Sequence, residues 1–234
     1  MVEYKQRGTL YGVSVGPGDP ELMTLQAVRR IEACPVVAAP RTRSGRMLAL
    51  EIARGAVDLS GKEVVELAFS MSRDPAVARA SHMAAAAALR VHLDAGRDVA
   101  LLNLGDVSVY ATFGYLQDIL QQEGYHTVML PGVPSFCAAA ARLDRPLTAG
   151  MYKPLTIAPG GAVEDVLDRP GSKVLMKTGS QLPQTLAALA AHGKLADSAM
   201  VCNCGLPGEE VWPDLSVYDP QRPAGYFATI LIKE

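Results

Sequence analysis

Short apolar runs alternate with longer amphipathic stretches through the first 131 residues. Apolar runs that end at glycine or proline predict strands, and stretches with apolar residues three or four apart predict helices. The predicted strands cover residues 9–15, 35–39, 62–67, 98–103 and 127–130. The predicted helices cover residues 21–33, 47–56, 75–95 and 110–123. This alternation predicts an open α/β sheet whose strands are mostly parallel.

The second half follows a different pattern. Helices are predicted over residues 135–142 and 182–191, and strands over residues 155–158, 173–177, 199–203, 210–217 and 226–232. The last two strands are joined by residues 219–223 without a helix, which favours antiparallel pairing and a mixed sheet. We therefore expect two α/β domains that meet near Pro131–Gly132, over residues 1–131 and 132–234.

Polar residues and glycines mark several of the predicted helix ends. Ser44 precedes the helix at 47–56 and Asp74 precedes the helix at 75–95, and both residue types accept hydrogen bonds from the first N–H groups of a helix. Gly96 and Gly124 follow two predicted helices, where glycine is common. We expect Ser44 and Asp74 to be N-cap residues.

The composition is that of an ordinary soluble protein, with 49% hydrophobic and 20% charged residues. The formal net charge of −2 lacks the basic excess typical of nucleic-acid binders. The N-terminal sequence MVEYKQRG has charges and no apolar segment, unlike a signal peptide, and the apolar stretches are shorter than a membrane span. We expect a cytoplasmic protein that binds neither nucleic acid nor membranes.

The four cysteines are few for a chain of 234 residues and do not have the spacing of a disulfide framework. No two of the four histidines are four residues apart, and metal ligation would need more cysteine or histidine at ligand spacing. The cysteines are interpreted as small buried apolar residues. We expect no structural zinc and no other metal bound by the protein itself.

Three turns rich in glycine and proline follow predicted strands, at residues 16–20, 105–106 and 131–135. Ligands of open α/β sheets bind at the carboxyl ends of the strands, and glycine allows close approach of the backbone. The chain lacks both G-x-G-x-x-G and the P-loop pattern, which disfavours a nicotinamide dehydrogenase and excludes a P-loop. From spacing alone, each turn is more often a plain connection than a site.

The same three turns resemble the signature segments of the tetrapyrrole methylase family. YGVSVGPGDPELMT at residues 11–24 resembles the opening motif, GDVSVY at 105–110 the G-D-P-x-x-Y loop, and PGVPSF at 131–136 the P-G-[IV]-[PS]-S corner. YFAT at 226–229 resembles the closing strand. Two residues depart from the pattern: Ser14 stands where glycine is common, and Val107 where proline is usual.

Within this family, the sequence is most similar to the precorrin-2 C20-methyltransferases of cobalamin biosynthesis. The similarity lies in Ser135–Phe136, in LMK at residues 175–177 and in AFSM at residues 68–71. It implies a homodimer of two-domain α/β chains of the class III S-adenosylmethionine methyltransferase type, with donor and tetrapyrrole in a cleft between the domains. We expect the glycine-bearing turns to converge there.

The resemblance also implies which residues bind the methyl donor, S-adenosylmethionine. It places the donor against residues 104–109, with Asp106 near the charged methionyl end. The expected donor-binding residues are Pro17, Leu104, Gly105, Asp106, Val109, Tyr110, Ser135, Phe136, Met176, Lys177 and Thr229. Structural alternatives remain for three of them: Asp106 as a turn residue, Met176 as core, and Tyr110 as a packing residue of a helix's first turn.

The implied substrate is a polycarboxylate, and the planar guanidinium of arginine suits carboxylates. Arg41, Arg43 and Arg46 follow a predicted strand end, and Arg73 follows residues 68–71. We expect at least one of the first three to contact substrate, the alternative being a solvated surface turn.

The base that removes the meso proton stays unassigned, with Tyr110 a weak candidate beside Asp19, substrate carboxylates and water. The sequence leaves open whether the substrate contains cobalt. The competing hypotheses are a methyltransferase of the same fold that acts on another tetrapyrrole position, RNA or protein, and a tetrapyrrole-binding or nucleotide-binding module without catalysis.

Overall fold

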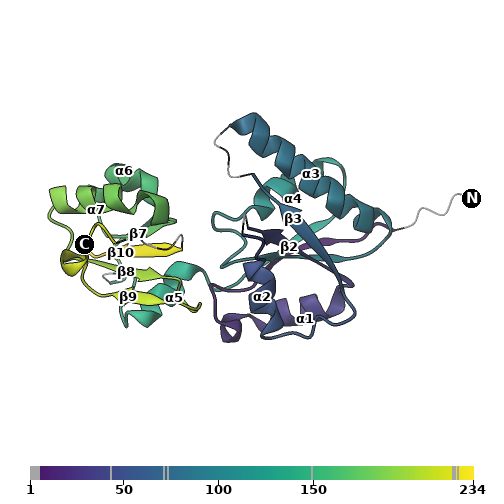
Figure 1. Cartoon of the computed structure of the whole chain (residues 1–234), viewed down its shortest axis with the longest axis horizontal. Coiled ribbons are helices and arrows are strands. Elements are labelled where there is room, and N and C mark those ends of the chain that lie inside the picture. Colours follow the sequence, from purple (N-terminus) through teal and green to yellow (C-terminus); the bar gives the residue numbers. More distant parts are fainter. Residues whose placement is uncertain are drawn as a thin grey trace, which may run out of the picture. The chain divides into compact units, whose positions relative to one another are not determined.

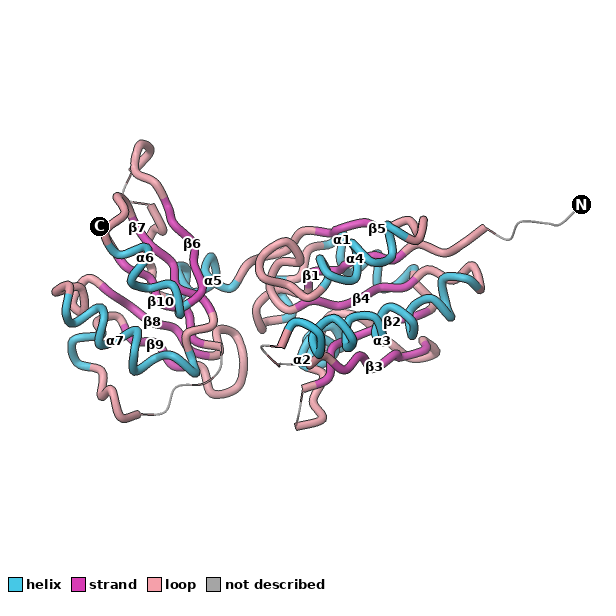
Figure 2. The backbone as a smooth tube through the Cα atoms, turned by 90° about the horizontal axis from the view of Figure 1, so that it is seen from above, coloured by secondary structure: helices cyan, strands magenta, loops and turns pink. Residues whose placement is uncertain are grey.

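The five strands of the first half form one parallel sheet in the computed structural model, which describes residues 6–42, 44–70, 72, 74–148, 150–222, 225 and 227–234. The sheet order is β3-β2-β4-β1-β5, as Figure 2 shows. The strands are β1 (Leu10–Ser14), β2 (Val36–Arg41), β3 (Glu63–Ala68), β4 (Val99–Asn103) and β5 (Thr127–Leu130). Because all pairings are parallel, the carboxyl ends of these strands lie at one edge.

Helices cover both faces of this sheet (Figure 1). The helices are α1 (Leu25–Ala33), α2 (Leu48–Arg54), α3 (Pro75–Asp94) and α4 (Phe113–Gln122). α3 and α4 lie on one face, and α1 and α2 on the other. The central strands β1, β2 and β4 are mostly buried on both faces, which explains why their sequences read as continuous apolar runs rather than as alternating patterns.

The second half forms a mixed sheet in the order β6-β7-β10-β8-β9. Its strands are β6 (Leu155–Pro159), β7 (Ser172–Met176), β8 (Ser198–Cys202), β9 (Glu210–Trp212) and β10 (Ala228–Ile232). β6 and β7 are parallel, and the other pairs are antiparallel. α6 (Val163–Leu167) and α7 (Leu182–Ala191) cover one face and α5 (Ser135–Arg142) the other, as Figure 1 shows.

The chain divides into two compact units, Met1–Pro134 and Ser135–Glu234. This division lies a few residues after the expected boundary near Pro131–Gly132. Each unit has its own apolar core. The first core includes Leu89, Leu101 and Phe113, and the second includes Leu175 and Ile230. In the described part of the chain, every helix is too short or too polar to cross a membrane.

Several helix starts differ from the sequence prediction. Asp74 is an N-cap as expected, because its carboxylate accepts from Ala76 N at 2.9 Å. Ser44 is not: α2 begins later, with Met47 as its N-cap, and the Ser44 hydroxyl lies 2.9 Å from Thr42 Oγ1. The helix expected over 21–33 is broken, because the Thr24 hydroxyl caps a separate α1.

Three further predictions are corrected by the backbone. The helix expected from Tyr110 begins at Phe113, since Tyr110 has a left-handed backbone with φ 49°. The strand expected over 210–217 ends at Trp212 and is followed by a short 3₁₀ helix, Leu215–Val217. The last two strands do not pair with each other, because β8 lies between β9 and β10. The mixed sheet itself is confirmed.

Candidate functional site

The loops that follow β1 and β4 are joined at the carboxyl edge of the first sheet. Gly105 N donates to Gly16 O at 2.7 Å, and Gly16 N donates to Gly105 O at 3.3 Å. Both residues have a left-handed backbone, with φ 71° at Gly105 and 75° at Gly16, a conformation that residues with a Cβ rarely adopt. The two glycines therefore form a short antiparallel bridge that brings the first two predicted turns together.

The third turn is tied to the other two through Ser14, the last residue of β1. Ser14 Oγ donates to Leu130 O at 2.7 Å and accepts from Val107 N at 2.8 Å, and its side chain is fully buried. Gly132 packs directly on this serine, because a Cβ added to Gly132 would lie 2.4 Å from Ser14 Cβ. The three turns therefore lie together at the carboxyl edge of the first sheet, while the cleft between the domains in which they are expected to converge stays a prediction.

Asp106 is held by hydrogen bonds from two of these turns. Its Oδ1 accepts from Ser108 N at 2.8 Å and from the Ser108 hydroxyl, and its Oδ2 accepts from Gly132 N at 2.7 Å. Desolvation acts to raise the pKa of Asp106, but these hydrogen bonds outweigh it and hold the pKa below its ordinary value. A fixed, ionised carboxylate thus lies where the turns meet. The contacts of Asp106 within its own loop also agree with the alternative interpretation, that Asp106 is a turn residue.

The other predicted donor-binding residues of the first unit lie in the same loops. Pro17 is buried, whereas Leu104 and Val109 are half-buried. Tyr110 is 45% exposed and follows them in its left-handed conformation. The carboxylate of Asp19, one candidate base, accepts from Glu21 N at 2.9 Å and so caps a 3₁₀ turn.

The second unit groups its predicted residues at one end of its sheet. Ser135 begins α5, and its Oγ lies 3.5 Å from Thr229 Oγ1 on β10. Met176 is the buried last residue of β7, and the register of Ile230 with Leu175, continued by one residue, places it beside Thr229. Phe136 is buried in α5, and Lys177 has a left-handed backbone with φ 56°.

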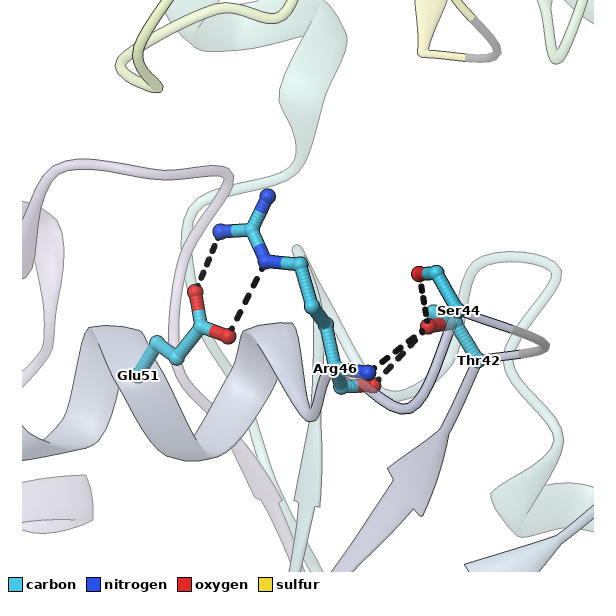
Figure 3. A network of polar contacts seen from close by, with 4 residues as sticks. All are labelled: Thr42, Ser44, Arg46 and Glu51. Atoms are coloured by element: carbon cyan, nitrogen blue, oxygen red, sulfur yellow. Dashed lines mark hydrogen bonds and ion pairs between the residues drawn. The ribbon is translucent and has the colours of Figure 1, made fainter.

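Arg41, the last residue of β2, and Arg46, in the loop that follows, form ion pairs with neighbouring carboxylates. Arg41 Nη1 lies 3.3 Å from Glu66 Oε2, and Arg46 Nε donates to Glu51 Oε1 at 3.2 Å. Figure 3 shows Arg46 pointing toward Glu51, while its backbone closes a turn with Thr42. Both pairs are exposed to solvent and therefore weak, so a ligand carboxylate can replace the partner. Arg43 and Arg73 lie outside the described residues.

Comparison with known proteins identifies the family. The family model for Tetrapyrrole (Corrin/Porphyrin) Methylases matches residues 9–216. The chain belongs to the tetrapyrrole methylases. The methylase is 36% identical to the cobalt-precorrin-2 C(20)-methyltransferase of Salmonella typhimurium over 97% of both chains. It is 30% identical to the precorrin-2 C(20)-methyltransferase of a Sinorhizobium species, over 96% of this chain and 95% of that one.

A solved structure shows the same fold. The uroporphyrin-III C-methyltransferase of Thermus thermophilus, complexed with S-adenyl homocysteine, has a TM-score of 0.68 to the methylase. The match covers 96% of this chain and 97% of that one, at 22% identity. The predicted architecture of two α/β domains, the first parallel and the second mixed, is therefore confirmed.

Sequence reasoning missed two residues at the carboxyl edge of the methylase's first sheet. His82 on α3 and Tyr115 on α4 stack on each other, and Phe69 packs against His82. Only Phe69 lies in a segment that resembles the family. His82 and Tyr115 are ordinary helix positions in the sequence, so no local signal pairs them. Within the described ranges, no group of three or more His, Cys, Asp or Glu is placed to hold a metal ion.

Proposed function

We propose that this chain transfers a methyl group from S-adenosylmethionine to C20 of precorrin-2 or its cobalt complex in cobalamin biosynthesis. The observation that carries the proposal is the full-length similarity to a relative named for this reaction, at 36% identity. The geometry agrees with it, because the three family motifs of the first unit are joined by hydrogen bonds around Ser14 and Asp106. The relative with the higher identity is named for the cobalt form, so we propose that form as the preferred acceptor.

The residues around Asp106 fit the chemistry of the donor. S-adenosylmethionine supplies an electrophilic methyl group on a sulfonium and carries an ammonium group at its methionyl end. An ionised carboxylate held by backbone N–H groups suits a cationic ligand, and Asp106 is such a group. We propose that Asp106 binds the ammonium, while residues 104–109 approach the donor through their backbone. The predicted donor-binding residues of the second unit remain part of this proposal.

The protein's part in this reaction is mainly to hold the reactants. Methyl transfer needs in-line approach of a ring carbon to the methyl carbon, and fixed geometry alone supplies a large rate enhancement. We propose that Arg41 and Arg46 contribute by pairing with peripheral carboxylates of the macrocycle, in exchange for Glu66 and Glu51. Tyr110, exposed at the end of the loop that contains Asp106, is proposed as the residue nearest to the departing proton.

Calorimetry with S-adenosylhomocysteine tests the donor site. The product contains the same ammonium, so Asp106→Asn is expected to weaken its binding by about tenfold to a hundredfold, since a hydrogen bond to a charged group contributes about 1.5–3 kcal/mol. Asp118→Asn is the matched control, because Asp118 is exposed on α4. Equal affinity of the Asp106→Asn variant and the control contradicts the assignment, provided that circular dichroism shows both to be folded.

An anaerobic assay tests the reaction itself. Purified protein is incubated with S-adenosylmethionine and either precorrin-2 or its cobalt complex, and NMR locates the new methyl group. Methylation at C20 is the expected result, with faster turnover of the cobalt complex. Methylation at another carbon contradicts the regiochemistry, and tetrapyrrole binding without turnover favours the non-catalytic module. Methylation of RNA instead favours the rival enzyme of the same fold.

The assembly and the location are proposals of the same kind. We propose a homodimer in the cytoplasm, as the family resemblance implies. Light scattering coupled to size exclusion is expected to give a mass of two 24.8 kDa chains. A mass of one chain at micromolar concentration contradicts the dimer.

A further inference from the structure

Three aromatic rings from three different elements gather beyond β3 at the carboxyl edge of the first sheet. Phe69 directly follows β3, His82 lies on α3, and Tyr115 lies in the first turn of α4. The rings of His82 and Tyr115 are stacked, with centroids 4.5 Å apart and planes 11° apart. The Phe69 ring packs against His82, with ring centroids 5.9 Å apart and ring planes tilted by 54°. These residues are called the aromatic stack below.

The backbone around the aromatic stack is fixed by hydrogen bonds. Ser70 N donates to Ser81 Oγ at 3.2 Å, and the Ser81 hydroxyl donates to Ala78 O at 2.7 Å. The end of β3 is thereby held on α3 next to His82. Burial lowers the pKa of the His82 imidazole and so favours its uncharged form, and the stacked ring supports Tyr115 as a flat aromatic surface.

Tyr115 leaves most of its surface to solvent. One face of its ring is covered by His82, yet the residue is 59% exposed. An exposed aromatic ring that is backed by a second ring is pre-organised to stack on a third, because it gives up little conformational freedom on binding. The aromatic stack therefore offers a ready surface for a flat, conjugated ligand.

The strand order divides the carboxyl edge into two sectors. The neighbours β4, β1 and β5 end in the glycine-bearing turns around Asp106, whereas β2 ends at Arg41 and β3 ends at Ala68, just before Phe69. Arg41 pairs in register with Ala68, the residue before Phe69, so their backbones lie at adjacent strand ends. The ion pair with Glu66 places the Arg41 side chain on the face of the sheet opposite to Phe69 and α3. A flat ring whose carboxylates sit on flexible chains can lie on the aromatic stack and extend one carboxylate over the sheet edge to Arg41.

We propose that the aromatic stack holds the acceptor, with a pyrrole ring of the tetrapyrrole packed on the exposed face of Tyr115 and a peripheral carboxylate paired with Arg41. This inference rests on the proposed function for the identity of the acceptor. Phe69 and His82 act as positioning residues, because they fix the plane of Tyr115. The donor is held by the other sector of the same edge. The two sites are close along the chain, because Tyr115 in α4 follows shortly after the loop that contains Asp106.

Substitution of Tyr115 in the full chain tests the proposal. The probe is uroporphyrin III, a stable tetrapyrrole with peripheral carboxylates, titrated by absorbance. Tyr115→Leu is expected to raise its Kd about fivefold to tenfold, the loss typical of one aromatic stacking contact. Tyr115→Phe keeps the aromatic face and is expected to bind within about twofold of wild type. Tyr152→Leu is the control, because Tyr152 is 95% exposed in the second unit.

A measurement on the unaltered protein covers the case in which Tyr115→Leu does not fold. The chain contains four histidines, so their imidazole protons are resolved by NMR after isotope labelling. A macrocycle stacked on Tyr115 places its ring current near His82, and the largest shift on addition of uroporphyrin III is therefore expected at His82. A larger shift at His126 or His192 than at His82 overturns the proposal.

The outcomes separate this proposal from the proposed function. If the protein methylates cobalt-precorrin-2 but Tyr115→Leu changes neither the Kd of uroporphyrin III nor the acceptor KM, the aromatic stack is not the acceptor surface. If Tyr115→Leu weakens S-adenosylhomocysteine as much as the porphyrin, the assignment to the acceptor is also overturned. If no tetrapyrrole is methylated but the porphyrin binds through Tyr115, the aromatic-stack proposal is supported and the proposed reaction is not.

Discussion

A single buried hydroxyl, on Ser14, connects two backbone segments that are far apart in the sequence. Its partners Leu130 and Val107 lie 116 and 93 residues away. The sequence marks Ser14 only as a departure from a glycine that is common in the family. Its role could not be predicted, because hydrogen bonds of this kind depend on the register of β1, β4 and β5 and not on the local pattern.

Ser14→Ala tests how much this hydroxyl contributes to stability. The substitution leaves the buried Leu130 carbonyl and Val107 N–H without their partner, so the free energy of unfolding is expected to fall by about 1–3 kcal/mol. Equilibrium denaturation measures the change. Ser180→Ala, at an exposed serine of the second unit, is expected to change it by no more than about 0.5 kcal/mol. A Ser14→Ala effect as small as the control would show that water replaces the hydroxyl.

Asp106 gives the site a predictable response to acid. Its pKa is lowered from an ordinary value of 3.8, so the folded protein keeps the carboxylate ionised to a lower pH than the unfolded chain does. The linked stability is present in full above the unfolded pKa and is lost as the pH falls through the folded pKa. We expect wild type to exceed Asp106→Asn in free energy of unfolding at pH 7, and the difference to shrink below about pH 4. Denaturant titrations between pH 7 and 3 measure it, and a difference independent of pH contradicts the assignment.

At the scale of elements, the sequence predicts the interior of each helix and strand better than its ends. Thr127–Leu130, Ser135–Arg142 and Leu182–Ala191 occur with the predicted bounds, because turn residues or charges flank them closely. Tyr110 was placed in a helix by its apolar neighbours, but its left-handed backbone belongs to the loop before α4. That conformation could not be predicted from the residue type, because a left-handed backbone is uncommon for a bulky side chain.

The packing of α4 on β1 gives a sharp test at this scale. Gly12 lies under the fully buried ring of Phe113, and a Cβ at Gly12 would come within 2.6 Å of two ring carbons. Gly12→Ala is therefore expected to lower the free energy of unfolding by about 1–3 kcal/mol through overpacking. Gly114→Ala is the matched control on the same helix, because nothing lies within 4 Å of its added Cβ.

A second substitution identifies the cause of that loss. Phe113→Leu removes the clashing ring carbons, so the double variant with Gly12→Ala is expected to be more stable than the sum of the two single effects predicts, by about 1 kcal/mol or more. Gly114→Ala is expected to be neutral or to stabilise by up to about 1 kcal/mol, the helix propensity difference. Additive effects of Gly12→Ala and Phe113→Leu would mean that strand geometry, and not contact with the ring, sets the cost.

For the whole molecule, the alternation of strands and helices was sufficient to predict two α/β domains and the character of each sheet. The order of the strands was not predictable in the same way. β10 comes last in the chain yet lies at the centre of the second sheet, between β7 and β8. Because this pairing joins distant segments, the sequence could suggest only the local alternative, a hairpin of β9 with β10.

The separation into two cores predicts how the chain responds to a cavity in either one. Leu175 is fully buried in the core of the second unit, and Leu101 is 1% exposed in the core of the first. Replacement of either leucine by alanine removes about 2–5 kcal/mol of packing energy. Because each cluster lies within one unit, the substitution is expected to destabilise mainly the unit that contains it.

Hydrogen exchange followed by mass spectrometry measures this directly. Leu175→Ala is expected to speed exchange of the amides in residues 135–234 by tenfold or more, as about 1.4 kcal/mol corresponds to a factor of ten, with a smaller change in residues 6–134. Leu101→Ala is expected to give the reverse pattern, which makes each variant the control for the other. Equal acceleration in both units by either variant would mean that the chain unfolds as one cooperative body. In that case the division at Ser135 would be a feature of its contacts and not of its stability.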